Sequence, residues 1–304
     1  MGLTEEAAAS LAAEEVVVSP AVRLPMPPRF TLGKVPVDCV SMDYAVVLLT
    51  EALLQRGARP PLTVVGPNAH LVNLAQRDSR FAEAMRQSDL SVPDGISVVL
   101  ACRLLGFSMP ERVTGGDLME KMCAAAALYG FRVFLLGGPL GVAAMAANNL
   151  LTRYPALNIC GTYCPPLGFE NDPAELHRIR AEIAAASPDL LFVAFGAPKQ
   201  EIWMQENHSL LKVSAILPVG AAFERQAGLR RRAPRWMQNA ALEWLFRLML
   251  EPHRLWRRYL LGNPRFVALV FRQWLREKTR ILRRRSRTHN DTSTHPESSR
   301  GVTP

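Results

Sequence analysis

Arginine and tryptophan are concentrated in the stretch RRRAPRWMQNAALEWLFRLMLEPHRLWRRY, residues 230–259. Guanidinium groups form paired hydrogen bonds with phosphate and carboxylate oxygens, so this stretch could hold a phosphorylated substrate, nucleic acid or an anionic membrane surface. Residues 225–287 contain 18 of the 36 Lys and Arg residues and three acids, a net charge of +15, so the rest of the chain carries −6. We therefore expect one region only to meet an anionic partner.

Polar residues also follow two apolar segments that read as strands. Asn68 follows TVVG, and Asp94 lies in VPDGIS. An Asn at a strand end can bind a sugar or a base, although capping of the next helix is its commoner role. Pro-Asp-Gly is an ordinary turn sequence, which is the simpler interpretation of Asp94. At the carboxyl end of a strand, the same carboxylate would point into the expected cleft and could act as a general base.

Two further loops combine glycine with polar residues. In LLGGPLGVAA, Gly137 and Gly138 would let the backbone approach a ligand such as a phosphate, and a tight turn between a strand and a helix explains them equally. In FGAPKQE, Lys199, Gln200 and Glu201 open a helix after a very apolar strand. So many polar residues at one strand end favour substrate contact, with ordinary surface charge as the alternative for Lys199 and Glu201.

Motifs for a metal centre are absent from the sequence. There is no His-Glu-x-x-His, no Gly-x-Ser-x-Gly, no Asp-x-Asp and no Walker loop, and the six histidines show no ligand spacing. Cys160 and Cys164 could ligate a metal, but no second pair follows, and buried structural cysteine is the commoner interpretation. We predict neither a metal nor a cofactor, so arginines would have to neutralise any bound diphosphate.

The scaffold that positions these loops follows from the apolar pattern. From about residue 60, short apolar runs alternate with segments of helical periodicity, which is typical of βαβ units. We predict a Rossmann-like α/β domain over residues 32–228, with a mainly parallel sheet flanked by helices and a ligand site at the carboxyl ends of the strands. The predicted strands are 62–66, 89–93, 132–138, 157–163, 189–196 and 213–220, and the predicted helices are 69–87, 96–105, 117–129, 140–153, 173–186 and 198–210. Asp117 with Glu120 predicts the capped start of the third helix.

The alternation stops after Gly228, and residues 229–285 read as a basic helical appendage. Three helical pieces are expected there, with breaks at Glu251-Pro252 and at Gly262-Asn263-Pro264. The last piece is amphipathic, a form suited to a membrane interface, and a helix docked on the body explains its pattern equally well. Its apolar face is predicted to hold Phe266, Val267, Val270, Phe271 and Trp274, and its basic face Arg265, Arg272, Arg276 and Arg280.

The two ends of the chain differ in composition from the rest. Residues 1–31 have acids where a secretory signal would need positive charge, so a disordered leader is expected, and the polar residues 286–304 predict a disordered tail. No stretch of 18 uninterrupted apolar residues occurs, which predicts no transmembrane helix. The five cysteines are an odd number in apolar stretches, which favours reduced thiols and a cytoplasmic location.

Several motifs, taken in order, resemble a known family. They are Asn68, SVPDGIS, PERVTGGDL, FLLGG, GFEND, FGAPKQE and RAPRWMQ…LEWLFRL…EPHRLWRRYLLGNP. Their order and spacing resemble the WecG/TagA/CpsF glycosyltransferases, family 26, from about residue 32 to residue 271. The resemblance implies a metal-independent inverting transferase that moves a sugar from a UDP donor to a glycan on undecaprenyl diphosphate, in the synthesis of a bacterial surface polysaccharide or exopolysaccharide.

The resemblance also implies roles for particular residues. It makes Asp94 the general base, and it places Asn68 near the donor sugar and Arg112 in the active site. Arg247, Arg254 and Arg257 match arginines thought to fold over the cleft and bind diphosphate at the membrane. The substrate-binding residues that we predict are Gly137, Gly138, Lys199, Gln200, Glu224, Arg232, Arg247, Arg254 and Arg257.

Two departures from the family pattern leave the donor sugar open. Gly66 stands where members often have threonine, and Phe223-Glu224 stands where they often have Phe-Asp. N-acetylmannosamine, N-acetylmannosaminuronic acid and glucose all remain candidates. The expected partners are a UDP-sugar, a lipid-linked acceptor and an anionic membrane surface, with the protein peripheral on the inner face of the bacterial cytoplasmic membrane; a homo-oligomer is left open.

Two other functions are weighed against this one. A nucleic-acid-binding protein would explain the net charge of +9 and the arginine-rich region, but no nucleic-acid-binding motif accompanies them. A nicotinamide-dependent oxidoreductase would use the same kind of sheet, but its dinucleotide fingerprint is missing. Both rank below the transferase.

Overall fold

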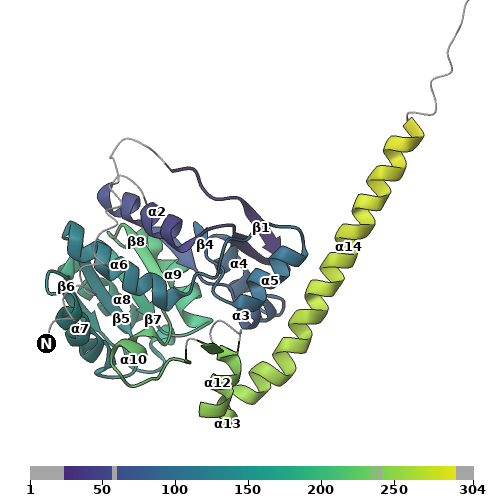
Figure 1. The fold of residues 1–304 in the computed structure, drawn as a ribbon. Helices are drawn as coiled ribbons and strands as arrows, with labels where there is room; N and C mark the ends of the chain where they lie inside the picture. The colour runs from purple at the N-terminus through teal and green to yellow at the C-terminus, as the bar shows by residue number, and fades with distance from the viewer. Residues whose placement is uncertain (1–23, 57–59, 235, 238–241, 292–304) are drawn as a thin grey trace, which may run out of the picture.

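A six-stranded, wholly parallel sheet forms the centre of the protein in a computed structural model that describes residues 24–56, 60–234, 236–237 and 242–291 (Figure 1). The strand order is β4-β3-β8-β7-β5-β6. The strands are β3 (Leu62–Val65), β4 (Leu90–Ser91), β5 (Arg132–Gly137), β6 (Asn158–Tyr163), β7 (Leu190–Ala194) and β8 (Ala215–Pro218). Each lies within a predicted strand, which confirms the predicted Rossmann-like α/β fold.

The core lies on both faces of this sheet, because the chain alternates sides along each strand. In β5, Val133 and Leu135 belong to one buried cluster, and Phe134 and Leu136 belong to another. Every residue of the central strand β7 is buried, as expected when helices cover both faces. The helices of the body are α2 (Met42–Leu54), α3 (Ala69–Ala75), α4 (Ser79–Arg86), α5 (Ile96–Leu104), α6 (Gly115–Tyr129), α7 (Val142–Arg153), α8 (Pro173–Ala186), α9 (Lys199–Asn207) and α10 (Ala222–Gln226), with short 3-10 turns η1 (Phe169–Asn171) and η2 (His208–Leu210).

Side-chain caps explain two of the differences between the predicted and the observed helix boundaries. The predicted helix 69–87 is two helices, because the Asp78 carboxylate accepts a hydrogen bond from the backbone N–H of Phe81 and begins α4. The start predicted at Asp117 is wrong. The Thr114 hydroxyl caps α6 by accepting from the N–H of Asp117, so that helix begins at Gly115.

An antiparallel hairpin and a helix precede the sheet, and the periodicity did not reveal them. The hairpin consists of β1 (Arg29–Leu32) and β2 (Val35–Asp38), and β1 begins inside the segment that we assigned to the leader. Arg29 donates two hydrogen bonds to the buried carboxylate of Asp38, which also accepts from the N–H of Ser91 in β4. The hairpin therefore fixes the strand that leads to Asp94. Residues 1–23 and 292–304 lie outside the described residues.

The appendage is a chain of helical segments that leaves the carboxyl edge of the sheet (Figure 1). It comprises α12 (Glu243–Leu250), α13 (Pro252–Trp256), the π-helical turn η3 (Arg257–Leu261) and the long α14 (Gly262–Asp291). The predicted break at Glu251-Pro252 is confirmed. At Gly262-Asn263-Pro264 the helix changes type but continues, because Pro264 occupies the first turn of α14, where no N–H is needed.

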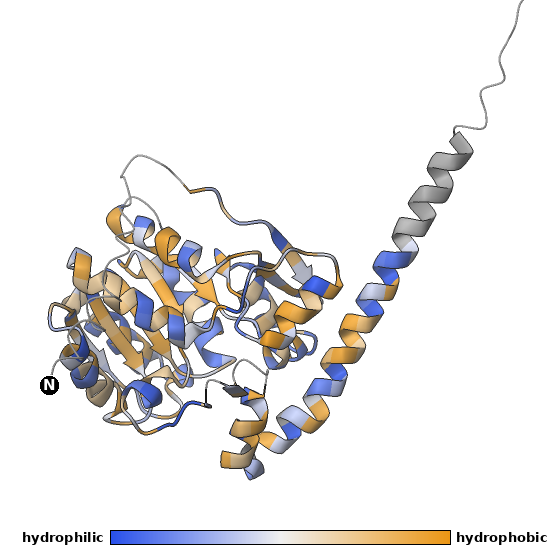
Figure 2. Ribbon diagram, viewed as in Figure 1, coloured by the Kyte–Doolittle hydropathy of each residue, from blue (hydrophilic) through white to orange (hydrophobic). Residues whose placement is uncertain are grey.

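The apolar side chains of α14 fall into two groups, contrary to the single face predicted. Phe266 and Val270 are buried in the cluster that contains α3 and the hairpin. Gln273 also accepts a hydrogen bond from the Gly33 N–H and donates one to the Thr31 carbonyl. The start of α14 is therefore docked on the body, while hydrophobic and hydrophilic residues alternate along the coloured part of the helix beyond it (Figure 2). No helix within the described ranges has the length and hydropathy to cross a membrane.

Candidate active site

Asp94 lies at the carboxyl edge of the sheet, in the loop after β4. Its N–H donates to the carbonyl of Pro67, which ties this loop to the loop after β3. A Cβ built on Gly66 would lie 3.2 Å from the Cβ of Asp94, so glycine there leaves space beside the carboxylate. The Asp94 side chain is half-buried. The structure thus places Asp94 where the sheet topology predicts a ligand site.

The charges around Asp94 come mainly from arginines. Burial raises the pKa of Asp94 above its ordinary value, and the positive charges of Arg247, Arg225 and Arg112 act in the opposite direction. Glu243 adds to the rise. A carboxylate with an elevated pKa is a better proton acceptor than an exposed one, which suits a general base.

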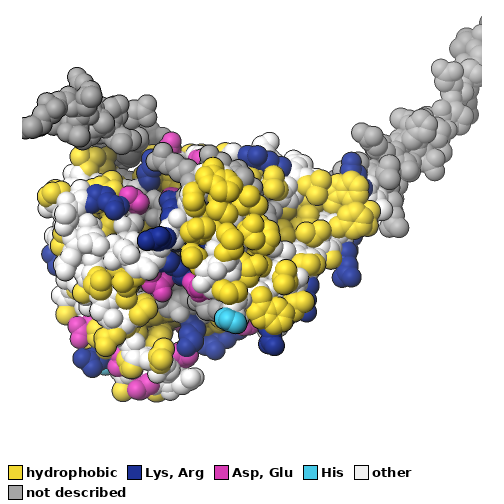
Figure 3. Space-filling model, turned by 60° about the horizontal axis from the view of Figure 1, so that its bottom comes forward, with side chains coloured by type: hydrophobic (Ala, Val, Ile, Leu, Met, Phe, Trp, Pro, Cys, Tyr) yellow, Lys and Arg dark blue, Asp and Glu magenta, His cyan; other side chains and the backbone are white. Residues whose placement is uncertain are grey.

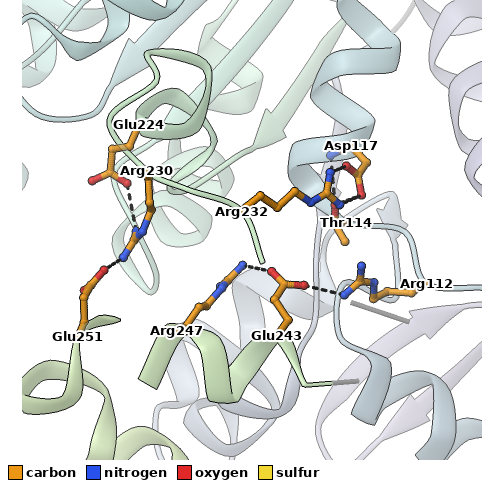
Figure 4. Close-up of polar contacts among 9 residues, drawn as sticks. All are labelled: Arg112, Thr114, Asp117, Glu224, Arg230, Arg232, Glu243, Arg247 and Glu251. Atoms are coloured by element: carbon orange, nitrogen blue, oxygen red, sulfur yellow. Dashed lines mark hydrogen bonds and ion pairs between the residues drawn. The ribbon is translucent and has the colours of Figure 1, made fainter. Parts of the chain in front are cut away.

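A helix of the appendage brings two of these charged residues to the body (Figure 4). Glu243, on α12, accepts from Arg112 at 2.8 Å and from Arg247 at 2.5 Å. The two guanidinium groups hold the pKa of Glu243 below its usual value in spite of burial. Glu243 therefore stays ionised between two arginines and neutralises part of their charge.

A second set of ion pairs continues the network (Figure 4). Arg232 donates two hydrogen bonds to Asp117, at 2.5 and 2.8 Å, and the Thr114 hydroxyl donates to the same carboxylate. Arg230 pairs with Glu224 of α10 and with Glu251, which follows α12. The segment that begins the appendage is thus fastened to both α6 and α10.

These arginines surround a small pocket between the body and α12. Arg225, Arg230, Arg231, Arg232 and Arg247 line it together with Glu243 and Glu251. Its volume is about 20 Å³, room for about one water molecule. A diphosphate is much larger, so α12 must move away from the body before one can bind among these arginines.

The remaining loop residues make internal contacts. The Asn68 side chain caps α3, accepting from the N–H groups of His70 and Leu71. Gln200 is buried, accepts from the Gly196 N–H and donates to Glu201. The structure therefore shows the helix-capping interpretation of Asn68, and it gives Gln200 a part in holding its own loop.

The two glycines of the loop after β5, and Lys199, also have structural roles. Gly137 and Gly138 have φ angles of 96° and 80°, and a Cβ on Gly137 would lie 2.7 Å from the Phe195 ring. Both glycines are thus required by the turn itself. Lys199 forms an ion pair with Glu170.

The appendage arginines are not all placed alike. Arg247 joins the network around Asp94, whereas Arg257 is exposed and lies over the ring of Trp256, 5.2 Å from its centroid. The side chain of Arg254 lies outside the described part of the structure.

Sequence reasoning missed Glu243, Arg225 and the partnership of Asp117 with Arg232. Glu243 lies within the quoted LEWLFRL, but nothing in that string indicates which arginines it contacts. Asp117 was interpreted as a helix cap. Its position three residues after Thr114 gives the true capping pattern, and that spacing was visible in the sequence.

Glu201 gives a stability prediction that does not depend on function. It is buried, its Oε2 has no hydrogen-bond partner among the described residues, and burial raises its pKa from 4.5 to about 7. Between these values the folded protein holds a proton that the unfolded chain releases. Stability should therefore fall as pH rises from 4.5 to 7, by roughly 3 kcal/mol at most, and stay level above.

The Glu201→Gln variant tests this expectation. It should lose that pH dependence and unfold at higher denaturant concentration than the wild type at pH 8. Glu206→Gln, an exposed change on the same helix, should follow the wild type. Parallel wild-type and Glu201→Gln curves of unfolding free energy between pH 5 and pH 8 would contradict the assignment.

A parallel sheet with a carboxylate and several guanidinium groups at its carboxyl edge is typical of an α/β enzyme. Comparison with protein families makes the class specific. The chain belongs to the glycosyl transferase WecG/TagA/CpsF family, whose model matches residues 30–280. It is therefore a glycosyltransferase, and the resemblance found from its motifs is confirmed.

Two curated relatives are similar over most of their length. One, from Bacillus subtilis (strain 168), is 30% identical over 212 residues, which cover 70% of this chain and 80% of the relative. The other, from Bacillus spizizenii (strain ATCC 23059 / NRRL B-14472 / W23), is 31% identical over 209 residues, which cover 69% and 78%. Both are named N-acetylglucosaminyldiphosphoundecaprenol N-acetyl-beta-D-mannosaminyltransferase.

Proposed function

We propose that this protein transfers N-acetylmannosamine from a UDP donor to N-acetylglucosaminyldiphosphoundecaprenol. The sugar and the acceptor are those in the names of the two Bacillus relatives. The observation that carries the proposal is the position of Asp94 at the carboxyl edge of the sheet, within the fields of Arg112, Arg225 and Arg247. N-acetylmannosaminuronic acid and glucose remain alternative donor sugars.

The proposed reaction divides its work between Asp94 and the arginines. Asp94 removes the proton of the acceptor hydroxyl as the oxygen attacks the anomeric carbon, and the bond to UDP breaks with inversion. The departing diphosphate gains negative charge, which Arg112 and Arg247 stabilise. Each charge-assisted hydrogen bond contributes roughly 1.5 to 3 kcal/mol, so two or three can replace a metal ion.

Substrate binding requires a rearrangement of the appendage. In the proposed mechanism the donor diphosphate takes the place of Glu243 between Arg112 and Arg247, once α12 has moved outward. Asn68, Gly137, Gly138, Lys199, Gln200, Glu224 and Arg232 are proposed to complete the substrate site from the strand-end loops and the start of the appendage. Arg254 and Arg257, on the same appendage, are proposed to reach the diphosphate after this rearrangement.

We also propose that the appendage docks on the inner face of the cytoplasmic membrane, where a lipid-linked acceptor is found. Hydrophobic side chains gather on the face that carries the appendage, with Lys and Arg beside them (Figure 3). Val267 and Phe271 on α14 are 64% and 54% exposed. The other large apolar residues that are exposed in the described part of the appendage are Leu229, Trp236, Trp244, Met249, Leu250, Trp256, Leu260, Leu261 and Leu275.

Replacing both Val267 and Phe271 with Ser should weaken binding to anionic phospholipid vesicles at least tenfold. Each side chain contributes about 1.5 to 3 kcal/mol when fully buried in an apolar medium, and partial burial still leaves a measurable loss. Co-sedimentation with vesicles gives the affinity. Leu128→Ser, at an exposed leucine on α6, is the matched control. Equal vesicle affinity of the double variant and the wild type would count against this surface.

The transfer itself is tested with purified protein, the lipid-linked acceptor and a panel of nucleotide sugars, with and without EDTA. We expect one extended lipid-linked product, with UDP-N-acetylmannosamine as donor and no loss of rate in EDTA. Mass spectrometry of the lipid product identifies the sugar added. No product from any UDP-sugar, or a rate that EDTA abolishes, would refute the proposal.

A further inference from the structure

Arg225 stands apart from the other arginines of the pocket. It lies on α10, its side chain is half-buried, and it lines the pocket beside Arg247. The described residues offer its guanidinium group no hydrogen bond and no ion pair within bonding distance, whereas Arg230, Arg232 and Arg247 each contact a carboxylate. Arg231 has no ion pair among the described residues either, but its side chain is exposed to solvent. A half-buried cation without a partner lowers stability, so packing alone does not explain this residue.

The charges around Arg225 do not neutralise its guanidinium group. Burial and the neighbouring charge of Arg247 lower its pKa, while the carboxylates of Asp94 and Glu243 only partly oppose them. An anion that entered the pocket would neutralise the positive charge of Arg225. It could contact Arg225 without first breaking an existing ion pair, which is not true of Arg112 or Arg247.

Gly116 provides the space in which this guanidinium group lies. A Cβ built on Gly116 would lie only 1.7 Å from Nη2 of Arg225 and 2.9 Å from its Cζ. Gly116 lies in the first turn of α6 and has no left-handed φ angle, so its backbone does not require glycine. Glycine in a helix costs about 1 kcal/mol relative to alanine. The side chain that glycine accommodates here is that of Arg225.

We propose that Arg225, held against Gly116, binds an anionic oxygen group of the sugar-nucleotide donor, either its diphosphate or a carboxylate on its sugar. This rests on the proposed transferase function and adds a donor-binding residue to it. Asp94 lies close enough for its charge to act on Arg225, so an anion bound there is near the reacting centre. Once α12 has moved aside, Arg225 can contact the donor without giving up a carboxylate, whereas Arg112 and Arg247 must first release Glu243.

The test measures equilibrium binding, which needs no transfer step. UDP, UDP-N-acetylmannosamine and UDP-N-acetylmannosaminuronic acid are titrated calorimetrically into the wild type and into Arg225→Gln. One lost charge-assisted contact of about 1.5 to 3 kcal/mol corresponds to a roughly 10- to 150-fold weaker Kd. If Arg225 binds the diphosphate, all three ligands lose affinity alike; if it binds a carboxylate, only the uronic acid donor does. Arg77→Gln, at an exposed arginine, is the control.

Gly116→Ala provides a second and independent variant. Its methyl group should displace the Arg225 guanidinium and weaken binding of the same ligand, whereas adding it to Arg225→Gln should cause little further loss. That non-additivity distinguishes anion binding from a general loss of structure. Wild-type affinity of Arg225→Gln for all three ligands would overturn the proposal. A wild-type protein that binds none of them would instead refute the transferase function on which the proposal rests.

Discussion

Asp94→Asn is expected to reduce the rate of sugar transfer by at least 100-fold while leaving the affinity for the UDP-sugar almost unchanged. The amide cannot accept the proton of the acceptor hydroxyl, and general base catalysis contributes about 10²- to 10⁴-fold. The amide has the size of the carboxylate and lies at the same strand end, so the shape of the site is kept. Steady-state rates with the lipid-linked acceptor and calorimetric titration of the donor measure the two effects separately.

The pH dependence of the wild type provides an independent check of Asp94. Burial raises its pKa, so the catalytic carboxylate should be protonated at pH values where an ordinary aspartate is ionised. The value of kcat/KM should therefore rise with pH through a pKa above the usual aspartate range, and the residual activity of Asp94→Asn should not show that rise. Asp43→Asn, at an exposed aspartate on α2, should behave like the wild type. Full activity of Asp94→Asn would remove the general base from the mechanism.

Arg247→Ala is expected to have the second largest effect, a loss of roughly 100- to 1,000-fold in kcat/KM. Arg247 is a cation that the appendage brings into the field of Asp94, and the departing diphosphate needs such a group in the transition state. In the variant, Glu243 keeps only Arg112 as a partner in this network, so its negative charge is less well neutralised. That charge then repels the anionic donor.

The loss of activity in Arg247→Ala can be distinguished from a loss of stability. Thermal unfolding of Arg247→Ala should change by only a few degrees, because the lost ion pair is partly exposed. Replacing Arg247 by Lys should restore part of the rate, since the charge remains but the paired hydrogen bonds do not. Arg86→Ala, at an exposed ion pair on α4, controls for loss of an arginine. A kcat/KM within threefold of the wild type would exclude Arg247 from the reaction.

The sheet and its loops could be predicted because local patterns specify them. The alternation of apolar strands with helical periods located all six strands, and the position of Asp94 after one of them placed its carboxylate at the correct edge. The hairpin at Arg29 was missed because it precedes the alternation of strands and helices by which the other six strands were recognised. Arg29 pairs there with the buried carboxylate of Asp38, and no local pattern encodes this contact.

The electrostatic network could not be predicted in the same way, because it depends on tertiary contacts. Glu243 and Arg112 are 131 residues apart in the chain, and only the docking of α12 joins them. The sequence of α14 likewise indicated one apolar face. Contact with α3 covers Phe266 and Val270 and leaves Val267 and Phe271 exposed. The interpretation as a docked helix is therefore confirmed for the start of α14, and the membrane interface stays a prediction.

Because α14 is attached to the body near its start, most of its length projects beyond the contact. At about 1.5 Å per residue its 30 residues extend roughly 45 Å, whereas the buried contacts of Phe266 and Val270 lie within the first three turns. If η3, α13 and α12 move as one body with α14, a tilt of the distant end shifts α12 on the other side of this contact. A force on the distant end of α14 would then strain the ion pairs of Glu243. The bending stiffness of α14 would determine what fraction of the force reaches them.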